Sequence, residues 1–356
     1  MTRMHLSLVT LGDPDTQTGG YLYHRRLADA APRYGAQIRF VSFPDRTFPA
    51  PALVGRAVLQ DAADGDVIVI DSIVAAFAAP WLRSVPRPLV GMLHQPAGGI
   101  DHGPLRTRIQ ARLDRRAYPY MRVLLVASQS LRRELGKLHD DVRLVEPGRD
   151  VASTLESDAG DLRCGRRVAF LCVANWMPRK GIVELLEAFA LLPPEAATLH
   201  LVGDDRADTR YASAVRRRLR HLDGRVVVHG VVPKERVAAL YRAADAFVMP
   251  SRQEPYGTVY GEAMAAGLPV VGWRAGNLPY LATHEREGLI VEPGDTAGLT
   301  AALRRLTEDA QVRAAMGAAA RQRAETFPTW EQTAERFFSI IRDVRETGDP
   351  PPDRRS

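Results

Sequence analysis

The feature that most constrains the fold is an alternation of short apolar runs with segments of helical periodicity, which occurs twice along the chain. In the first half, the apolar runs predict strands at residues 5–10, 37–43, 67–71, 89–94, 123–127 and 142–145. Helical patterns lie between the strands, as at residues 21–34 and 106–120. Strands and helices that alternate in this way indicate a mostly parallel sheet.

The alternation stops after residue 149 and begins again near residue 167. The sequence VASTLESDAGDLRCG is polar and lacks an apolar period, so we interpret residues 151–166 as a linker between domains at 1–150 and 167–328. The second domain has predicted strands at 168–174, 198–202, 226–229, 246–249, 269–272 and 288–291, and helices that begin at residues 182, 210, 234, 258 and 296. A further amphipathic helix is predicted at 329–345, followed by a disordered tail at 346–356.

Length and composition agree with two globular domains, since a domain usually has roughly 100–200 residues and the chain has 356. The net charge of +6 suits an anionic ligand or an acidic membrane surface, whereas a nucleic-acid-binding protein would carry a stronger, more clustered basic charge. The first apolar segment is too short for a signal peptide, and no run approaches the ~18 apolar residues of a membrane span. Cys164 and Cys172 lack zinc-type spacing, which fits a reduced, cytoplasmic protein.

The strongest chemical motif follows a predicted strand of the second domain, where a loop with Glu254 leads into a helix that begins near Gly257 and carries Glu262. Free amides at Gly257, Thr258 and Val259, together with the positive end of the helix dipole, would bind phosphate. We expect Glu254 to accept hydrogen bonds from sugar hydroxyls and Glu262 from ribose hydroxyls. The alternative is two glutamates on a solvated helix face, which the strand, loop and glycine around them disfavour.

A second motif, Arg179-Lys180-Gly181, lies between a predicted strand and the helix that begins at residue 182. A lysine at a helix N-terminus is electrostatically unfavourable unless an anion compensates its charge. Lys180, with Arg179 beside it, is therefore a candidate for binding a diphosphate. A surface lysine in a solvated loop is the alternative.

Two weaker signals lie in the first domain. Gly19 and Gly20 follow the first strand and open a helix, where glycines let the backbone approach phosphate closely. They do not form a complete dinucleotide fingerprint. His94 ends the fourth strand, at the edge of the sheet where ligands bind, and the alternative there is a structural histidine.

At these residues the chain resembles glycosyltransferase family 4, a group of retaining enzymes with the GT-B fold, in which two doubly wound Rossmann-like α/β domains face a central cleft. The resemblance covers nearly the whole chain and rests on the Glu254 and Glu262 pair, the loop with Lys180, the amino-terminal glycines and His94. Further matching segments are residues 146–150, 276–279, 288–294 and 327–331. In this fold, the final helix at 329–345 crosses back onto the first domain.

The resemblance implies transfer of a sugar from a nucleotide-diphosphate sugar, of UDP or GDP type, to an acceptor with retention at the anomeric carbon. His94, Lys180 and Glu254 would be the catalytic group. The donor would bind at Gly19, Gly20, Asn175, Arg179, Lys180, Gly257, Thr258, Val259 and Glu262. No metal and no other cofactor is implied, and the leaving phosphate itself would accept the proton of the acceptor.

The chain departs from the family at one position. The family usually has an arginine five residues before the loop lysine, and this sequence has Asn175. The pyrophosphate thereby loses one charge-assisted hydrogen bond, which Arg179 or Arg252 would have to replace. The departure bears on donor affinity and donor type.

The acceptor is a small metabolite or a lipid-linked molecule. The basic helix at residues 106–116 is open to three interpretations, which are docking on anionic lipid, binding of an anionic acceptor, and a solvated face. The expected location is the cytoplasm, with a peripheral contact to the inner membrane face left open, and no nucleic-acid partner is expected. Two rival functions on the same fold are a non-catalytic nucleotide-sugar-binding module and a nucleotide-sugar epimerase.

Overall fold

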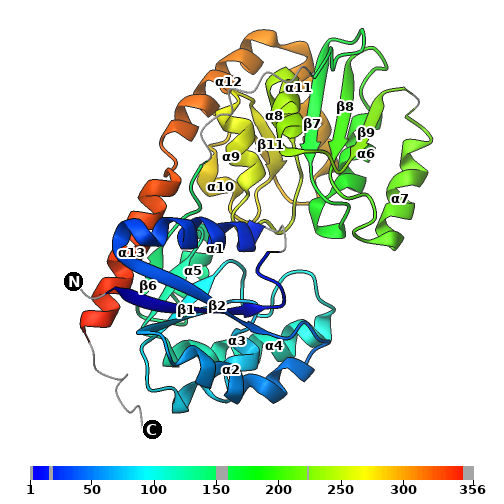
Figure 1. The fold of residues 1–356 in the computed structure, drawn as a ribbon. Coiled ribbons are helices and arrows are strands. Elements are labelled where there is room, and N and C mark those ends of the chain that lie inside the picture. Colours follow the sequence, from blue (N-terminus) through cyan, green and yellow to red (C-terminus); the bar gives the residue numbers. More distant parts are fainter. Residues whose placement is uncertain (1–2, 16–18, 150–158, 223, 348–356) are drawn as a thin grey trace. The chain divides into compact units, whose positions relative to one another are not determined.

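The structure, a computed structural model, describes residues 3–15, 19–149, 159–222 and 224–347 (Figure 1). Contacts divide the chain into two compact units, which we call unit 1 (Met1–Gly148 with Pro328–Ser356) and unit 2 (Arg149–Phe327). Most of the predicted linker, residues 151–158, lies outside the described residues, and residues 159–166 contain turns and a bend but neither helix nor strand. Residues 348–356 of the predicted tail also lie outside the described part.

Unit 1 contains, in chain order, β1 (Met4–Leu11), α1 (Gly19–Ala30), η1 (Ala31–Tyr34), β2 (Ala36–Phe43), η2 (Ala50–Val54), α2 (Gly55–Ala62), β3 (Val67–Asp71), α3 (Ala75–Ala78), η3 (Leu82–Ser84), β4 (Leu89–Leu93), α4 (Pro104–Ala117), η4 (Tyr118–Tyr120), β5 (Val123–Val126), α5 (Gln129–Leu135), β6 (Val142–Leu144) and α13 (Trp330–Glu346), where η marks a 3₁₀ helix.

The sheet of unit 1 is parallel and has the strand order β2-β1-β3-β4-β5-β6. Successive side chains of a strand face opposite sides of the sheet. Leu8 of β1 accordingly packs in the cluster that contains α1 and α13, whereas Val9 packs with α2 and α3 on the other face. Strands buried on both faces have continuous apolar sequences, which is why they stand out along the chain.

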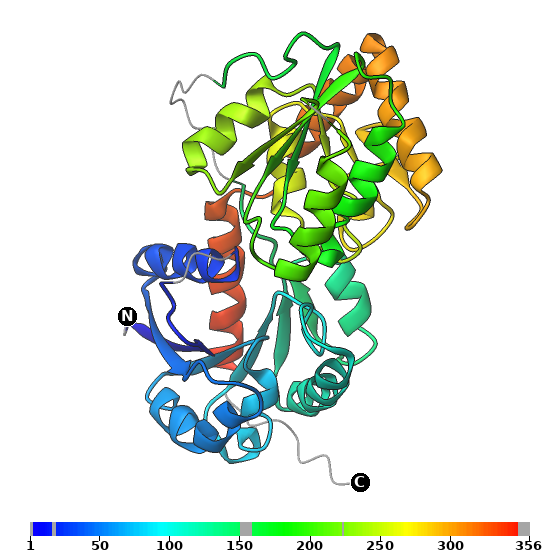
Figure 2. The same ribbon diagram turned by 90° about the vertical axis from the view of Figure 1, so that its right-hand side faces the viewer.

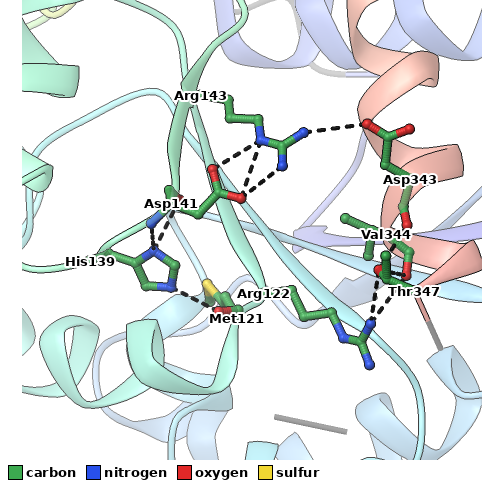
Figure 3. Close-up of polar contacts among 8 residues, drawn as sticks. All are labelled: Met121, Arg122, His139, Asp141, Arg143, Asp343, Val344 and Thr347. Atoms are coloured by element: carbon green, nitrogen blue, oxygen red, sulfur yellow. Dashed lines mark hydrogen bonds and ion pairs between the residues drawn. The ribbon is translucent and has the colours of Figure 1, made fainter. Parts of the chain in front are cut away.

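Helix α13, although distant in sequence, lies beside the unit 1 sheet (Figure 2). Its apolar face is buried, and Phe338 stacks on Tyr34 with ring centroids 4.9 Å apart. Near its end, Asp343 lies 3.5 Å from Arg143 and the carbonyl of Val344 accepts a hydrogen bond from Arg122, as Figure 3 shows. These contacts with β6 and with the residue before β5 make the end of the described chain part of unit 1.

Unit 2 contains, in chain order, β7 (Val168–Val173), η5 (Pro178–Lys180), α6 (Ile182–Ala190), β8 (Ala197–Val202), α7 (Thr209–Leu219), β9 (Val226–Gly230), α8 (Lys234–Ala243), β10 (Ala246–Val248), α9 (Thr258–Ala265), β11 (Val270–Trp273), α10 (Leu278–Leu281), β12 (Gly288–Val291), α11 (Thr296–Glu308) and α12 (Ala310–Glu325).

The sheet of unit 2 is also parallel, with the order β12-β11-β10-β7-β8-β9. The sheet grows outward from β7 in two directions, and right-handed crossovers then place helices on both faces. One apolar cluster joins the strands to the helices and includes Phe170, Phe247 and Trp273, all fully buried.

All twelve predicted strands are present, with ends within one residue of the prediction. The helices are less accurate. The predicted helix at 21–34 is α1 followed by the 3₁₀ turn η1, and the prediction leaves out α12. The sequence of α12, AQVRAAMGAAARQRAE, is dominated by alanine, and apart from Met316 its buried residues are small and give only a weak apolar stripe.

Candidate active site

Each sheet reverses its strand order at one place, and doubly wound sheets bind ligands beyond the carboxyl ends of the strands at such a point. The reversal lies between β7 and β10 in unit 2 and between β1 and β3 in unit 1. The predicted site residues follow these strands in the chain, except His94, which follows the neighbouring β4. Each unit therefore carries its own group of candidate residues at its own switch point.

In unit 2, the basic loop after β7 has a conformation that requires glycine at its end. The 3₁₀ turn Pro178–Lys180 is followed by Gly181, whose φ of 71° is in the left-handed region, and α6 begins at the next residue. A Cβ atom on Gly181 would lie 2.1 Å from the carbonyl oxygen of Pro250. Any side chain here would therefore be strained and would also push the two loops apart.

Backbone hydrogen bonds join this basic loop to the loop after β10. The carbonyl of Arg179 accepts a hydrogen bond from the amide of Arg252 at 2.7 Å and one from the hydroxyl of the buried Ser251 at 3.1 Å. Arg179 in turn donates to the carbonyl of Gln253 at 3.1 Å. All three hydrogen bonds end on a main-chain carbonyl, and one of them is also donated by a main-chain amide, so they fix the backbones of the two loops relative to each other.

The charged side chains of the two loops meet at Glu254. Its carboxylate forms an ion pair with Lys180, and Nη1 of Arg179 lies 3.8 Å from the same oxygen. The three side chains are only 12–18% exposed, so their charges interact through a medium less polar than bulk water. Two cations face one carboxylate, and the excess positive charge suits an anionic ligand.

Glu254 is held from its other side by the turn before α10. The carbonyl of Glu254 accepts a hydrogen bond from the amide of the buried Asn277 at 3.0 Å, and the Asn277 side chain donates to the carbonyl of Tyr256 at 2.9 Å. Gly276 has a φ of 57°, and a Cβ there would lie 2.6 Å from the Glu254 carbonyl oxygen. The Glu254 backbone is therefore fixed by two neighbouring turns.

Helix α9 begins directly after this loop, with Gly257 as its N-cap at φ 87°. The helix hydrogen bonds start with the amide of Tyr260, which donates to the Gly257 carbonyl. The amides of Gly257, Thr258 and Val259 precede the first helical bond, as expected of a helix N-terminus. They lie at the end of the loop that carries Glu254, where the positive end of the helix favours an anion.

Glu262 is an exposed residue on the same helix and has a different neighbour from Glu254. Burial, followed by the nearby Glu262 carboxylate, raises the pKa of Tyr241 well above its usual value. The structure thus pairs Glu254 with cations and Glu262 with a tyrosine.

Asn175, just after β7, makes a hydrogen bond within the protein. Its side-chain oxygen accepts a hydrogen bond from the amide of Asp204 at 3.0 Å and so ties the β7 loop to the end of β8. Arg252 is likewise engaged, because it forms an ion pair with Glu184 at 3.1 Å and is half exposed. Of the two arginines considered as replacements at this place, Arg179 is the one beside Glu254.

In unit 1, His94 lies under the start of α1. A Cβ on Gly20 would lie 3.9 Å from Cδ2 of His94, so the amino-terminal glycines and the histidine are neighbours, as predicted residues of one site should be. His94 packs edge-on against Tyr23, with centroids 4.9 Å apart. Burial, with a smaller effect of His24, lowers the pKa of His94 to about 4, against the opposing effect of Asp71.

Sequence reasoning missed the residues behind His94, which are His24 and Asp71. Nε2 of His24 lies 3.0 Å from Nε2 of His94 and 3.7 Å from the Asp71 carboxylate. Asp71 ends β3, and a buried acid at the carboxyl end of a strand is a signal that could have found it. His24 lies within a helix, where the sequence gives no sign of a distant partner.

Two searches of the described residues bear on other kinds of site. No group of three or more histidine, cysteine, aspartate or glutamate side chains in the described ranges is arranged to hold a metal ion. No described helix is long and apolar enough to cross a bilayer.

The family model described as "Glycosyl transferases group 1" matches residues 167–309. A D-inositol 3-phosphate glycosyltransferase of Corynebacterium glutamicum (strain R) is 33% identical over 218 residues, 57% of this chain and 50% of that protein. A GDP-mannose-dependent monoacylated alpha-(1-6)-phosphatidylinositol monomannoside mannosyltransferase of Corynebacterium glutamicum is 34% identical over 179 residues, 48% of this chain and 46% of that protein. The chain spans about half the length of the curated relatives it matches.

Solved structures match almost the whole chain. A sucrose-phosphate synthase from Thermosynechococcus elongatus has a TM-score of 0.81 at 22% identity and covers 97% of this chain and 100% of its own. The Anabaena protein HepE in complex with UDP has a TM-score of 0.78 at 22% identity, with 96% and 100% covered. These likenesses confirm the predicted GT-B fold of two doubly wound Rossmann-like domains. The chain therefore has the GT-B fold, and its residues 167–309 match the family model of the group 1 glycosyl transferases.

Proposed function

We propose that this protein is a glycosyltransferase that moves a sugar from a nucleotide-diphosphate sugar, of UDP or GDP type, to an acceptor with retention at the anomeric carbon. The observation that carries the proposal is the cationic group of Lys180 and Arg179 around Glu254, placed after β7 and β10 at the switch point of unit 2. The family match over residues 167–309 supports it.

In this proposal, Lys180, Arg179 and the first amides of α9 bind the diphosphate. Their charges act where negative charge develops as the bond between the sugar and the phosphate breaks, which lowers the barrier to that step. Glu254 exchanges its ion pair with Lys180 for hydrogen bonds to the sugar hydroxyls. His94 contacts the transferred sugar, and the leaving phosphate takes the proton of the acceptor hydroxyl as the new glycosidic bond forms.

Arg179 takes the place of the arginine that the family has at the position of Asn175. It already lies 3.8 Å from Glu254, whereas Arg252 is held by Glu184. Asn175 keeps its own hydrogen bond to the amide of Asp204 and contributes to the shape of the loop. The diphosphate site thus retains two cations from adjacent residues.

The acceptor is a small metabolite or a lipid-linked molecule. Two relatives are named for transfer that involves inositol 3-phosphate and a phosphatidylinositol mannoside. Helix α4 supports a contact with an anionic membrane surface, because Leu105 and Ile109 are 73% and 45% exposed beside five arginines of the same helix. The protein would then work in the cytoplasm and touch the inner membrane face.

The first test is nucleotide binding, measured by thermal unfolding and calorimetry with UDP, GDP, ADP, TDP and CDP. A ligand at 100 times its Kd adds about 2.7 kcal/mol of stability, and each kcal/mol raises Tm by roughly 2–4 °C in domains of this size. We expect a clear shift with UDP or GDP. No shift with any nucleotide for a well-folded sample would contradict the proposal.

Arg179→Ala and Arg252→Ala form a matched pair for the same assay, since both remove an arginine from neighbouring loops of unit 2. A charge-assisted hydrogen bond contributes about 1.5–3 kcal/mol, so Arg179→Ala should weaken nucleotide binding about tenfold or more. Arg252→Ala should change it much less. Equal losses would show that Arg179 does not replace the missing arginine.

Product analysis separates the transferase from its rivals. A transferase releases the nucleoside diphosphate when it passes the sugar to an acceptor. Without acceptor it releases the diphosphate only by slow hydrolysis of the donor. Conversion of the donor to an isomer without acceptor would show an epimerase. Tight binding without turnover would show a non-catalytic module, for which Asn175 is the supporting observation.

A further inference from the structure

A buried polar cluster lies behind His94 in unit 1, and the proposed function does not use it. It consists of Thr10, Asp71, His24 and His94, from β1, β3, α1 and the end of β4. His24 is 1% exposed and Asp71 is 3% exposed. Burying such groups costs free energy unless they are well paired, so their arrangement calls for a physical reason.

The two imidazoles are bound to each other. Nε2 of His24 lies 3.0 Å from Nε2 of His94, which is a hydrogen-bond distance. A neutral imidazole carries one N–H and one bare nitrogen. One Nε2 must therefore donate and the other accept, and the tautomer of His24 dictates the tautomer of His94.

The imidazoles are neutral at ordinary pH. Burial lowers the pKa of His24 to about 3 and, with the smaller effect of His24, that of His94 to about 4. Two protonated rings at this distance would repel each other. A single proton therefore lies between the two facing nitrogens.

The surroundings of His24 favour the proton on its Nε2. The Asp71 carboxyl group lies 3.7 Å from this nitrogen. It accepts hydrogen bonds from the Thr10 hydroxyl at 3.0 Å, the Ser72 hydroxyl at 3.1 Å and the Ile73 amide at 3.2 Å. Burial raises the pKa of Asp71, and His94 and these three donors oppose the rise. The Asp71 oxygens act as acceptors, so the nitrogen of His24 that faces them is more stable with a hydrogen than with a bare lone pair.

The other nitrogen of His24 leads to the same tautomer. Nδ1 is buried and has no hydrogen-bond partner within the described part of the chain. If Nε2 were bare, Nδ1 would carry a buried N–H without an acceptor, and orphaned buried N–H groups are rarer than unsatisfied acceptors. The tautomer with the proton on Nε2 leaves only a bare lone pair unsatisfied.

We infer that His24 is a positioning residue that donates from Nε2 to Nε2 of His94 and so holds His94 as its Nδ1–H tautomer, which presents a hydrogen-bond donor to the sugar. The hydrogen bond from His94 to the sugar rests on the proposed function, whereas the tautomer of His94 does not. With Nε2 of His94 occupied, Nδ1 is the nitrogen left for a ligand. His94 then acts on a hydroxyl oxygen as a donor and does not accept its proton.

The tautomers are measured in the full-length protein without ligand, by long-range ¹H–¹⁵N correlation spectra of ¹⁵N-histidine, with His94→Gln for assignment. We expect His94 protonated at Nδ1 and His24 protonated at Nε2. His94 protonated at Nε2 would overturn the inference. Because no substrate is needed, this result stands apart from the success or failure of the proposed function.

His24→Gln and His24→Leu are the matched variants. The glutamine amide can occupy the place of Nε2 and donate to His94, whereas leucine has similar bulk and no donor. Glutamine should keep the His94 tautomer, and leucine should yield a mixture of tautomers. For His24→Leu, kcat for sugar transfer should fall about tenfold, the equivalent of one hydrogen bond. His24→Gln should lower kcat less, and the KM for the donor should change less than kcat in both variants.

Equal behaviour of the two variants in both measurements would contradict the inference, since a purely structural role would not distinguish them in the spectrum. Thermal unfolding checks that each variant folds. If leucine prevents folding, the wild-type spectrum and the glutamine variant still decide the tautomer. A confirmed tautomer in a protein that binds no nucleotide would refute the proposed function alone.

Discussion

The two units place polar groups at the same kind of position, beyond the carboxyl ends of parallel strands, and stabilise them in different ways. In unit 2, the cations of Lys180 and Arg179 face the carboxylate of Glu254, so opposite charges compensate each other. In unit 1, His24 and His94 are neutral and linked by one proton. The comparison shows that one sheet topology supports both a charged, loop-borne site and a buried, proton-ordered site.

The difference follows from where the side chains come from. The unit 2 residues lie on loops that backbone hydrogen bonds fix, so partial exposure solvates their charges. The unit 1 residues come from strand ends and a covering helix, where water is excluded. A buried charge costs far more than a buried neutral group, so the unit 1 site has to order protons in place of charges.

The largest effect is expected for Lys180→Ala, which removes the cation that the proposal places on the diphosphate. Loss of one such transition-state contact typically costs about 10²–10³-fold in rate. We expect this loss in kcat/KM for sugar transfer, with the fold unchanged. Lys137→Ala is the control, since Lys137 is an exposed residue of unit 1. Similar activities of the two variants would show that Lys180 does not contribute to sugar transfer, and the charged group of unit 2 would then not be a catalytic site.

The second effect concerns the backbone that fixes the charged site. Gly181→Ala would place a Cβ 2.1 Å from the Pro250 carbonyl at a φ of 71°. We expect unit 2 to lose about 3 kcal/mol or more of unfolding free energy in denaturant titrations, because overpacking adds to backbone strain. Gly165→Ala has a similar φ of 78° but nothing within 4 Å, and should cost only about 1 kcal/mol. Equal costs would show that the loops can separate freely.

The sequence predicts the charged site far better than the neutral one, for a physical reason. Strands buried on both faces appear as apolar runs, and Lys180, Glu254 and Gly257 lie in loops within about ten residues of such runs. Their neighbours in sequence are also their neighbours in space. The pairing of His24 with His94 spans 70 residues and depends on how α1 lies over β4. No local pattern encodes that contact. The same holds for the use of Asn175 by the amide of Asp204.

The third effect tests the neutrality of the unit 1 site through pH. Burial lowers the pKa of His24 to about 3, below its value in the unfolded chain. The titratable groups that face it are Asp71, His94 and the edge-on rings of Tyr21 and Tyr23. The unfolded state therefore binds a proton as the pH falls through 6.5, and the stability that neutral His24 provides above that pH is lost on the way to pH 3. One such proton is worth about 1.4 kcal/mol per pH unit.

We expect the stability advantage of the wild type over His24→Leu to shrink by about 2 kcal/mol between pH 7 and pH 5. Urea titrations at several pH values measure it. A difference that stays constant over this range would mean that His24 binds a proton in the folded protein as readily as in the unfolded chain, and burial would then not keep it neutral.

The smallest effect tests whether a second buried group of unit 1, beside the loop that follows His94, is also neutral. Asp114 of α4 accepts a hydrogen bond from the amide of Gly98 at 2.8 Å and is 2% exposed. Burial raises its pKa to about 7, and Tyr118 is the titratable group beside it. Because the folded pKa lies above the unfolded one, the stability associated with the protonated form is present below about pH 4 and is lost as the pH rises towards 7.

Asp114→Asn keeps an oxygen for the Gly98 amide and cannot ionise. We therefore expect the unfolding free energy of the variant, relative to that of the wild type, to be about 1–2 kcal/mol higher at pH 8 than at pH 5. Asp101→Asn, which changes an exposed residue of the same loop, is the matched control for removing one carboxylate. If the Asp114 variant gains nothing at pH 8, the carboxylate must be stabilised as a charge. Unit 1 would then combine a neutral histidine pair with a compensated charge in the adjoining loop, and the contrast with unit 2 would apply to the histidines alone.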